Sequence, residues 1–260
     1  MRDTYLSGPV PEQPRRAFPP PLGEANLAAT DSGGHPCGQD KNLARWRNGV
    51  QTTPLHKNGT VNHPPYSGGT VVGMEAMRLG HAHAQRYDAL HEGLAMAGEG
   101  WALEMGVHRG TTLRMIAAER PDKVVGFDSL CGLPEDWMGE WVQGTFAMEQ
   151  PPIVDGADFV AGWFTDTVKP WTDAHPGRIA FIHVDCDLYS STKDVFDAIG
   201  HRLEPGCVIV FDEYHNYPGW EQHEARAWLE YTAAHPELVY TMIEPPGVQQ
   251  VIVVIDGFDS

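Results

Sequence analysis

The chain has 260 residues, of which 42% are hydrophobic, which is enough to bury one sizeable core. Its 18 Lys and Arg against 35 Asp and Glu give a formal net charge of -17, which disfavours a nucleic-acid backbone or an anionic membrane as the main partner and favours a small molecule or another protein. The N-terminus shows no basic segment followed by an apolar run, and no stretch approaches the roughly 20 apolar residues that span a bilayer, so we expect a cytoplasmic protein. The four cysteines form no CxxC pair, and we expect them to be reduced thiols.

Residues 1–70 are predicted to form a flexible or draped N-terminal arm, followed by one domain over residues 71–260. Residues 1–80 contain ten of the 21 prolines and show no sustained period of 2 or 3.6. They also hold eight Lys or Arg and six Asp or Glu, so the acidic excess lies beyond them. A lid that folds over a substrate stays open as an alternative role for the arm.

From about residue 80, short apolar runs alternate with amphipathic stretches. This pattern predicts strands over residues 101–105, 123–128, 178–185, 206–214, 238–245 and 249–256, and helices over residues 81–98, 111–120, 190–203 and 220–235. The last two strands are joined by Pro-Pro-Gly and are expected to pair antiparallel. The alternation implies a mostly parallel α/β sheet with ligands beyond the carboxyl ends of its strands.

The first strand is followed by Glu104, by Gly106 and Gly110, and by a helix that starts near Thr111. Glycines let the backbone turn tightly near a ligand, and a helix start offers unpaired N–H groups. Asp128 ends the second strand 22 residues beyond Gly106, near the spacing typical of a ribose-binding carboxylate. These residues suggest a nucleoside-containing cofactor. Glu104 would repel a pyrophosphate and suits the positive charges of S-adenosylmethionine, although a plain strand-end charge is the alternative.

The chain resembles the macrocin O-methyltransferase-like family of class I S-adenosylmethionine-dependent methyltransferases over about residues 80–256. The resemblance is carried in order by the phrases LEMGVHRGTT, GFDSLCGLPEDW, GWFTDTV, HVDCDLYSST and FDEYHNYPGWEQHE. It implies a Rossmann-like, seven-stranded, mostly parallel sheet flanked by helices, with the last strand antiparallel. It also implies methyl transfer from S-adenosylmethionine to a hydroxyl of a small molecule, such as a sugar or natural product.

The resemblance further implies which residues bind the cofactor. Glu104, Gly106 and Gly110 would line its methionine part, and Asp128, with Ser129 adjacent, would bind the ribose hydroxyls. The border of the adenine would be formed by Gly162, Trp163 and Phe164.

In the resembled family, an aspartate that ends the fourth strand joins an acidic pair that ends the fifth to hold a divalent cation, usually magnesium. The corresponding residues are Asp185, Asp212 and Glu213, although the family commonly has a second aspartate where this chain has Glu213. Such a cation would lower the pKa of a substrate hydroxyl, and Asp185 would accept its proton. The resemblance therefore implies Mg²⁺ assistance with Asp185 as the catalytic base.

Two histidines, His215 and His223, follow the fifth strand together with Tyr214, Tyr217 and Trp220. A histidine at this place would serve as a base or orient an acceptor, and we take His215 as the second catalytic candidate. The aromatic side chains would form a wall for the acceptor. The alternative is a surface loop that leads into an amphipathic helix.

Two other classes of function stay open. The domain would also suit a catalytically silent methyltransferase-like protein kept for binding or assembly. A non-haem iron oxygenase would use His183, Asp185 and either His215 or His223 as ligands, because His183 and Asp185 face the same side of a strand. That reading leaves Glu104 unexplained. The sequence does not fix the identity of the acceptor or whether the protein is a homo-oligomer.

Overall fold

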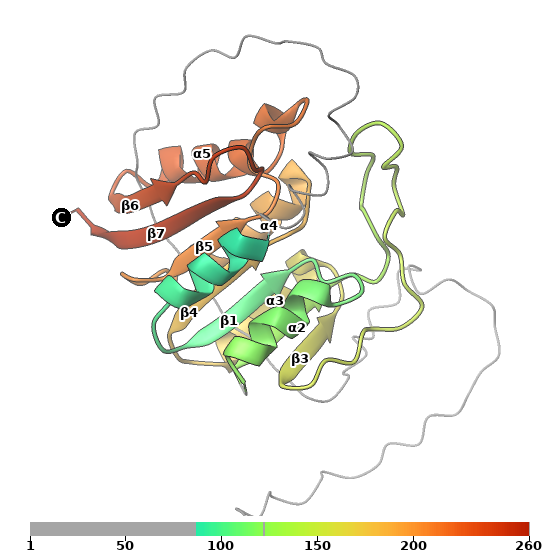
Figure 1. Cartoon of the computed structure of the whole chain (residues 1–260), viewed down its shortest axis with the longest axis horizontal. Coiled ribbons are helices and arrows are strands. Elements are labelled where there is room, and N and C mark those ends of the chain that lie inside the picture. The colour runs from blue at the N-terminus through green and yellow to red at the C-terminus, as the bar shows by residue number, and fades with distance from the viewer. Residues whose placement is uncertain (1–86, 122, 260) are drawn as a thin grey trace, which may run out of the picture. The chain divides into compact units, whose positions relative to one another are not determined.

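The computed structural model of the chain describes residues 87–121 and 123–259. They form a seven-stranded sheet of order β3-β2-β1-β4-β5-β7-β6, in which β7 is antiparallel to both β5 and β6 and the other pairs are parallel. The expected Rossmann-like sheet with an antiparallel last strand is therefore confirmed (Figure 1). The expected arm over residues 1–70 lies outside the described residues.

The observed elements match most of the expected ranges. The strands are β1 (Trp101–Met105), β2 (Val124–Asp128), β3 (Ala157–Ala161), β4 (Ile179–Val184), β5 (Val208–Phe211), β6 (Leu238–Ile243) and β7 (Val251–Phe258). The helices are α2 (Thr111–Glu119), α3 (Phe164–Ala174), α4 (Tyr189–Ile199), α5 (Glu224–Ala234), the 3-10 turn η1 (Trp220–Gln222) and a helix over residues 87–96. The sequence patterns did not predict β3, which lies at the edge of the sheet, or α3, which contains Pro170 in its interior.

Helices cover both faces of the sheet (Figure 1). The helix over residues 87–96 and α2 pack on one face, where Leu90, Leu113 and Val210 belong to one hydrophobic cluster. Helices α3, α4 and α5 pack on the other face, where Phe196 and Trp228 belong to the second cluster. These two cores fix the sheet between its helices, so the side chains at its carboxyl edge are presented by a rigid frame.

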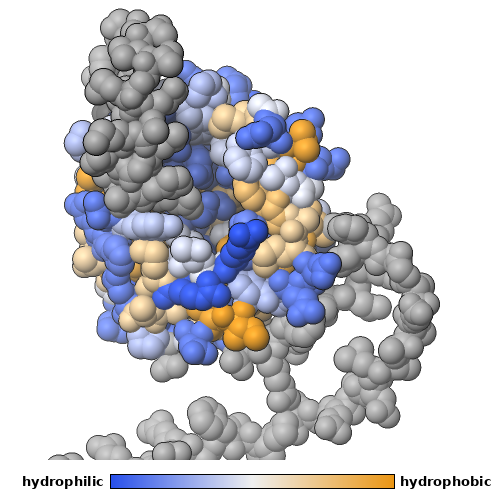
Figure 2. All heavy atoms as spheres, turned by 45° about the vertical axis from the view of Figure 1, so that its right-hand side comes forward, coloured by the Kyte–Doolittle hydropathy of each residue, from blue (hydrophilic) through white to orange (hydrophobic). Residues whose placement is uncertain are grey.

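The surface of the described residues is mixed. Figure 2 shows hydrophobic residues in small patches among hydrophilic ones on one face of the molecule. Within residues 87–121 and 123–259, no helix is both long and apolar enough to cross a bilayer. Cys186 and Cys207 are free thiols, whereas Cys131 is disulfide-bonded, so the expectation of reduced thiols is wrong for Cys131.

The order of the strands reverses between β1 and β4, which are direct neighbours although β2 and β3 lie between them in sequence. Open α/β sheets bind ligands at such a switch point, beyond the carboxyl ends of the strands. Gly106 follows β1 here with a φ of 90°, and a Cβ at this position would lie 1.8 Å from the carbonyl oxygen of Asp185. Only glycine therefore allows the two strand ends to come this close.

We predict that Gly106→Ala lowers the free energy of unfolding by about 3 kcal/mol, because the new methyl group clashes with backbone and φ is positive. This corresponds to a fall in Tm of roughly 6–12 °C, measured by thermal unfolding. Gly98→Ala is the matched control, since a Cβ at Gly98 meets nothing within 4 Å. Equal Tm values for the two variants would contradict the close approach of the strands.

Candidate functional site

Polar side chains replace apolar ones near the carboxyl ends of three adjacent strands. On β1, β4 and β5, the residues Ala102, Phe181 and Val210 belong to the cluster under α2. Residues two positions further along a strand point to the same face, which places Glu104 and His183 on that face. The apolar pattern of this face therefore ends in a buried polar layer at the switch point.

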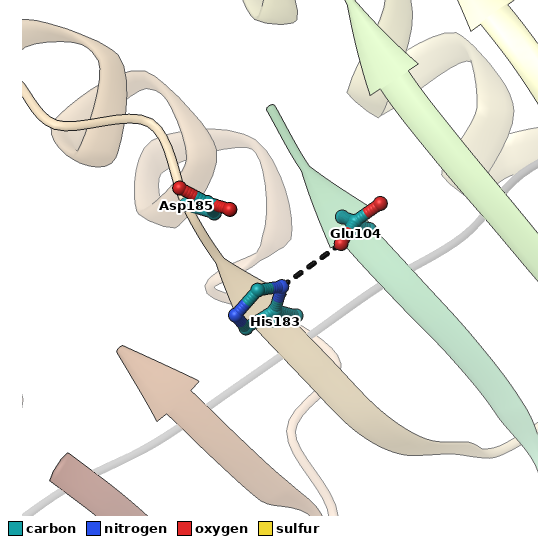
Figure 3. A group of neighbouring side chains, drawn as sticks. All are labelled: Glu104, His183 and Asp185. Atoms are coloured by element: carbon teal, nitrogen blue, oxygen red, sulfur yellow. Dashed lines mark hydrogen bonds and ion pairs between the residues drawn. The ribbon is translucent and has the colours of Figure 1, made fainter. Parts of the chain in front are cut away.

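Glu104 and His183 form a buried pair across β1 and β4 (Figure 3). His183 Nδ1 lies 2.9 Å from Glu104 Oε1, and the two side chains are 1% and 0% exposed. On its other side, His183 Nε2 lies 3.7 Å from Oδ1 of Asp212, which is also buried. The second oxygen of Glu104, Oε2, is buried and has no hydrogen-bond partner.

Burial alone would lower the pKa of His183, but the neighbouring carboxylates of Asp212, Glu104 and Asp185 raise that pKa to about 10. The raised pKa favours the imidazolium form, in which neither nitrogen offers a lone pair to a metal. Ligand atoms of Glu104, His183 and Asp185 do lie within 4.8 Å of one another, but both ring nitrogens of His183 already face carboxylates, those of Glu104 and Asp212. This arrangement argues against the ligand set of the iron oxygenase, which requires a lone pair from His183.

Three carboxylates form a compact acidic cluster at the ends of β4 and β5. Ligand oxygens of Asp185, Asp187 and Glu213 all lie within 4.8 Å of one another. Burial raises the pKa of Glu213 well above its usual value, and the charges of Asp212 and Asp185 raise it further. The cluster differs from the expected set, because Asp187 stands beside Asp185 and Glu213 while Asp212 lies next to His183.

Glu224, the first residue of α5, is a buried part of this site that the sequence interpretation missed. Its carboxylate accepts hydrogen bonds from the backbone N–H of Glu213 at 3.1 Å and of Cys186 at 3.5 Å. It thereby joins the chain after β4 to the chain after β5. A signal was present in the sequence, since Glu224, Trp228 and Tyr231 share one helical face and the two aromatic residues are core residues.

Asp128 organises the turn after β1. Its Oδ2 accepts the backbone N–H groups of Val107 at 3.0 Å and His108 at 2.9 Å, and its Oδ1 accepts that of Leu130 at 2.8 Å. Ser129 accepts the N–H of Cys131 with its hydroxyl oxygen at 3.0 Å. Asp128 thus lies against the glycine turn, on the same edge as Glu104.

The other expected cofactor residues lie at the same edge. Gly110, with a φ of 71°, precedes α2, which begins at the exposed Thr111 and has no side-chain cap. The N–H of Gly162 donates to the carbonyl of Asp128 at 3.0 Å, so the end of β3 lies beside the end of β2. Trp163 is 39% exposed there. Phe164 begins α3 and packs against the core beneath it.

His215 is buried, and its Nε2 lies 3.8 Å from Glu244 Oε2. Its ring also packs against Tyr214 and Trp220. His215 is therefore packed between the segment that follows β5 and the segment that follows β6. Its assignment as a base stays a prediction.

Trp137, from the segment between β2 and β3, packs on the segment after β5. Its ring centroid lies 5.9 Å from that of Tyr217 and 6.2 Å from that of His223, and Tyr217 and His223 stack on each other. Burial raises the pKa of Tyr217, and nearby Glu224 and Glu213 raise it further. Tyr217 of this aromatic group therefore lies close to the acidic cluster, whereas Tyr214 is fully buried, and the role of these residues as an acceptor wall stays a prediction.

The family model of a methyltransferase domain matches residues 103–214, from β1 to just beyond β5. This part of the chain is therefore similar to a methyltransferase domain. The solved structure of the calicheamicin methyltransferase CalS11 shares the fold of this chain, with a TM-score of 0.55 and 24% identity over 70% of this chain and 82% of that one.

Two curated relatives match this chain over a short segment. One is the 8-demethyl-8-(2,3-dimethoxy-alpha-L-rhamnosyl)-tetracenomycin-C 4'-O-methyltransferase of Streptomyces olivaceus, 42% identical over 60 residues. The other is the mycinamicin III 3''-O-methyltransferase of Micromonospora griseorubida, 37% identical over 60 residues. Each match covers 23% of this chain and 22% of the relative, so it spans about a fifth of either protein.

The residues of this site fit a cationic cofactor and a hard cation. Glu104 Oε2 is a buried oxygen without a partner, which suits an ammonium group as a donor. The oxygens of Asp185, Asp187 and Glu213 are the ligand type that Mg²⁺ prefers.

We predict that Glu224 makes the metal-free protein less stable as pH rises. Burial, and then the charges of Asp187 and Asp212, raise the pKa of Glu224 in the folded state well above its usual value. The stability that this group contributes is therefore complete below its unfolded pKa of about 4.3 and is lost as pH rises toward the folded pKa.

Urea unfolding of the wild type and of Glu224→Gln from pH 5 to pH 8.5, with chelator present, measures this effect. We expect the stability of the wild type relative to the variant to fall steadily with pH. Glu230→Gln, at an exposed site on the same helix, is the control and lacks this trend. A difference between wild type and Glu224→Gln that stays constant with pH would refute the assignment.

Proposed function

We propose that the protein is an O-methyltransferase that uses S-adenosylmethionine to methylate a hydroxyl of a sugar or natural product, assisted by a divalent cation such as Mg²⁺. The observation that carries the proposal is that Glu104, with its free buried oxygen, lies beside the acidic cluster at the switch point of the sheet. The names of the two curated relatives, both O-methyltransferases that act on natural products, support the class of acceptor.

The residues divide into a cofactor side and an acceptor side. On the cofactor side, Glu104 binds the ammonium group, the turn of Gly106 and Gly110 admits the methionine part, and Asp128 accepts the ribose hydroxyls. Since Asp128 already accepts N–H groups of the turn, it orients the turn and the ribose together. Ser129 lies next to Asp128 on the ribose side, and the adenine would be bordered by Gly162, the exposed Trp163 and Phe164.

On the acceptor side, Asp185 and Glu213 hold the cation together with Asp187 or Asp212. Asp185 accepts the proton of the acceptor hydroxyl, and the aromatic group around Tyr217 holds the acceptor. When bound, S-adenosylmethionine supplies the methyl group on its sulfonium, and the cation lowers the pKa of the hydroxyl. His215 stays a second candidate for the base. A cytoplasmic location, a homo-oligomeric state and a lack of nucleic-acid or membrane partners stay expectations.

The proposal predicts that the protein transfers one methyl group to a hydroxyl of a glycosylated natural product. The purified protein is incubated with S-adenosylmethionine and a panel of rhamnosylated and macrolide-type acceptors, and products are identified by mass spectrometry. We expect one acceptor to gain the mass of a methyl group while S-adenosylhomocysteine accumulates. Cofactor binding without turnover of any acceptor would instead favour the silent binding protein.

A second prediction concerns Asp185. Asp185→Asn keeps the shape of the side chain but removes an anionic ligand and a base, so we expect kcat to fall at least about 10²-fold with cofactor affinity nearly unchanged. Chelation of the wild type should abolish turnover, and added Mg²⁺ should restore it. Turnover of folded Asp185→Asn at the wild-type rate would remove Asp185 from the mechanism.

A further inference from the structure

His183 is a buried polar residue to which the mechanism above gives no role. The other five residues of β4 are apolar and buried, and valine or isoleucine would continue that pattern. A buried histidine between two carboxylates costs desolvation, and such groups are often replaceable by apolar residues without loss of stability. Packing therefore does not account for His183.

The contacts of His183 join the two halves of the site. On the cofactor side, the 2.9 Å contact from Nδ1 fixes Glu104 Oε1 and leaves Oε2 for a ligand. On the acceptor side, Nε2 faces Asp212 Oδ1 at 3.7 Å, and the Asp212 carboxyl group in turn interacts with Glu213 of the acidic cluster. Gln250 Nε2 donates to Asp212 from the other direction, to its carbonyl at 2.7 Å and to Oδ1 at 3.3 Å. Asp212 is thus held between His183 and Gln250.

We infer that His183 is a positioning residue that orients Glu104 for the cofactor with one ring nitrogen and Asp212 for the cation site with the other. This inference rests on the proposed function. Because β1, β4 and β5 are adjacent in the sheet, one side chain on the middle strand reaches carboxylates on both neighbours. Glu104 and Asp212 are therefore set by a single group.

Two conservative variants separate the two contacts. The amide nitrogen of asparagine reaches about the position of Nδ1, and that of glutamine reaches about the position of Nε2. His183→Asn should keep the bond to Glu104, and His183→Gln should keep the contact with Asp212. Cofactor affinity is measured by calorimetry with S-adenosylmethionine. Cation affinity is measured by electron paramagnetic resonance with Mn²⁺ as the probe.

We expect His183→Asn to bind S-adenosylmethionine as the wild type does but to bind Mn²⁺ about tenfold more weakly. His183→Gln should show the reverse, and His183→Leu should lose affinity for both ligands, since bonds to charged groups are worth a factor of ten or more. Ile182→Val is the control for packing in β4 and should change neither affinity. A merely structural histidine would lower Tm in the variants without this split.

The inference would be overturned if His183→Asn and His183→Gln changed the affinities for both ligands equally. It would also be overturned if neither variant changed either affinity. If neither variant folds, Asp212→Asn tests the acceptor side from its far end: it should weaken Mn²⁺ binding and leave the affinity for S-adenosylmethionine unchanged, and unchanged Mn²⁺ affinity in that variant would overturn the inference. A wild type that binds S-adenosylmethionine but not Mn²⁺ would overturn the inference while leaving the cofactor part of the proposed function intact. A wild type that binds neither ligand would refute the proposed function itself.

Discussion

Negative charge buried at one edge of the sheet is the constraint on which the rest of the site depends. Glu104, Asp212, Glu213 and Glu224 are all buried, and Asp185 and Asp187 lie beside them. Burial disfavours the ionised form of these carboxyl groups, and like charges this close disfavour it further unless a proton or cation compensates them, which explains the raised pKa values of Glu213 and Glu224. Such an edge is unfavourable for an unliganded fold and favourable for one that binds cationic ligands.

The two hydrophobic cores allow this concentration of charge. Backbone N–H groups and one histidine satisfy part of it, because Glu224 binds two N–H groups, Asp128 binds three, and His183 lies between Glu104 and Asp212. What these partners leave is the second oxygen of Glu104, and the acidic cluster lies near it. The first suits a cationic cofactor and the second a divalent cation, as the proposed methyl transfer requires.

The sequence predicted the sheet, its antiparallel last strand and the strand ends that carry Glu104, Asp128 and Asp185, because apolar runs followed by acids mark the ends of parallel strands. It did not predict the pairing of Glu104 with His183, since the two residues are 79 positions apart and meet only because β1 and β4 are neighbours. The same reason applies to Asp212 and Gln250. The position of Glu224 could have been predicted from the helical periodicity, because that periodicity puts Glu224 on the core face of the helix with Trp228.

The central claim is that a cationic cofactor and a divalent cation bind side by side at this edge. A crystal structure with S-adenosylhomocysteine and Mn²⁺, in which anomalous scattering locates the manganese, tests it most directly. The account predicts a manganese peak coordinated by Asp185 and Glu213, with the cofactor over the turn at Gly106 and its amino group at Glu104. A cofactor bound away from Glu104, or a manganese peak away from the acidic cluster, would contradict it.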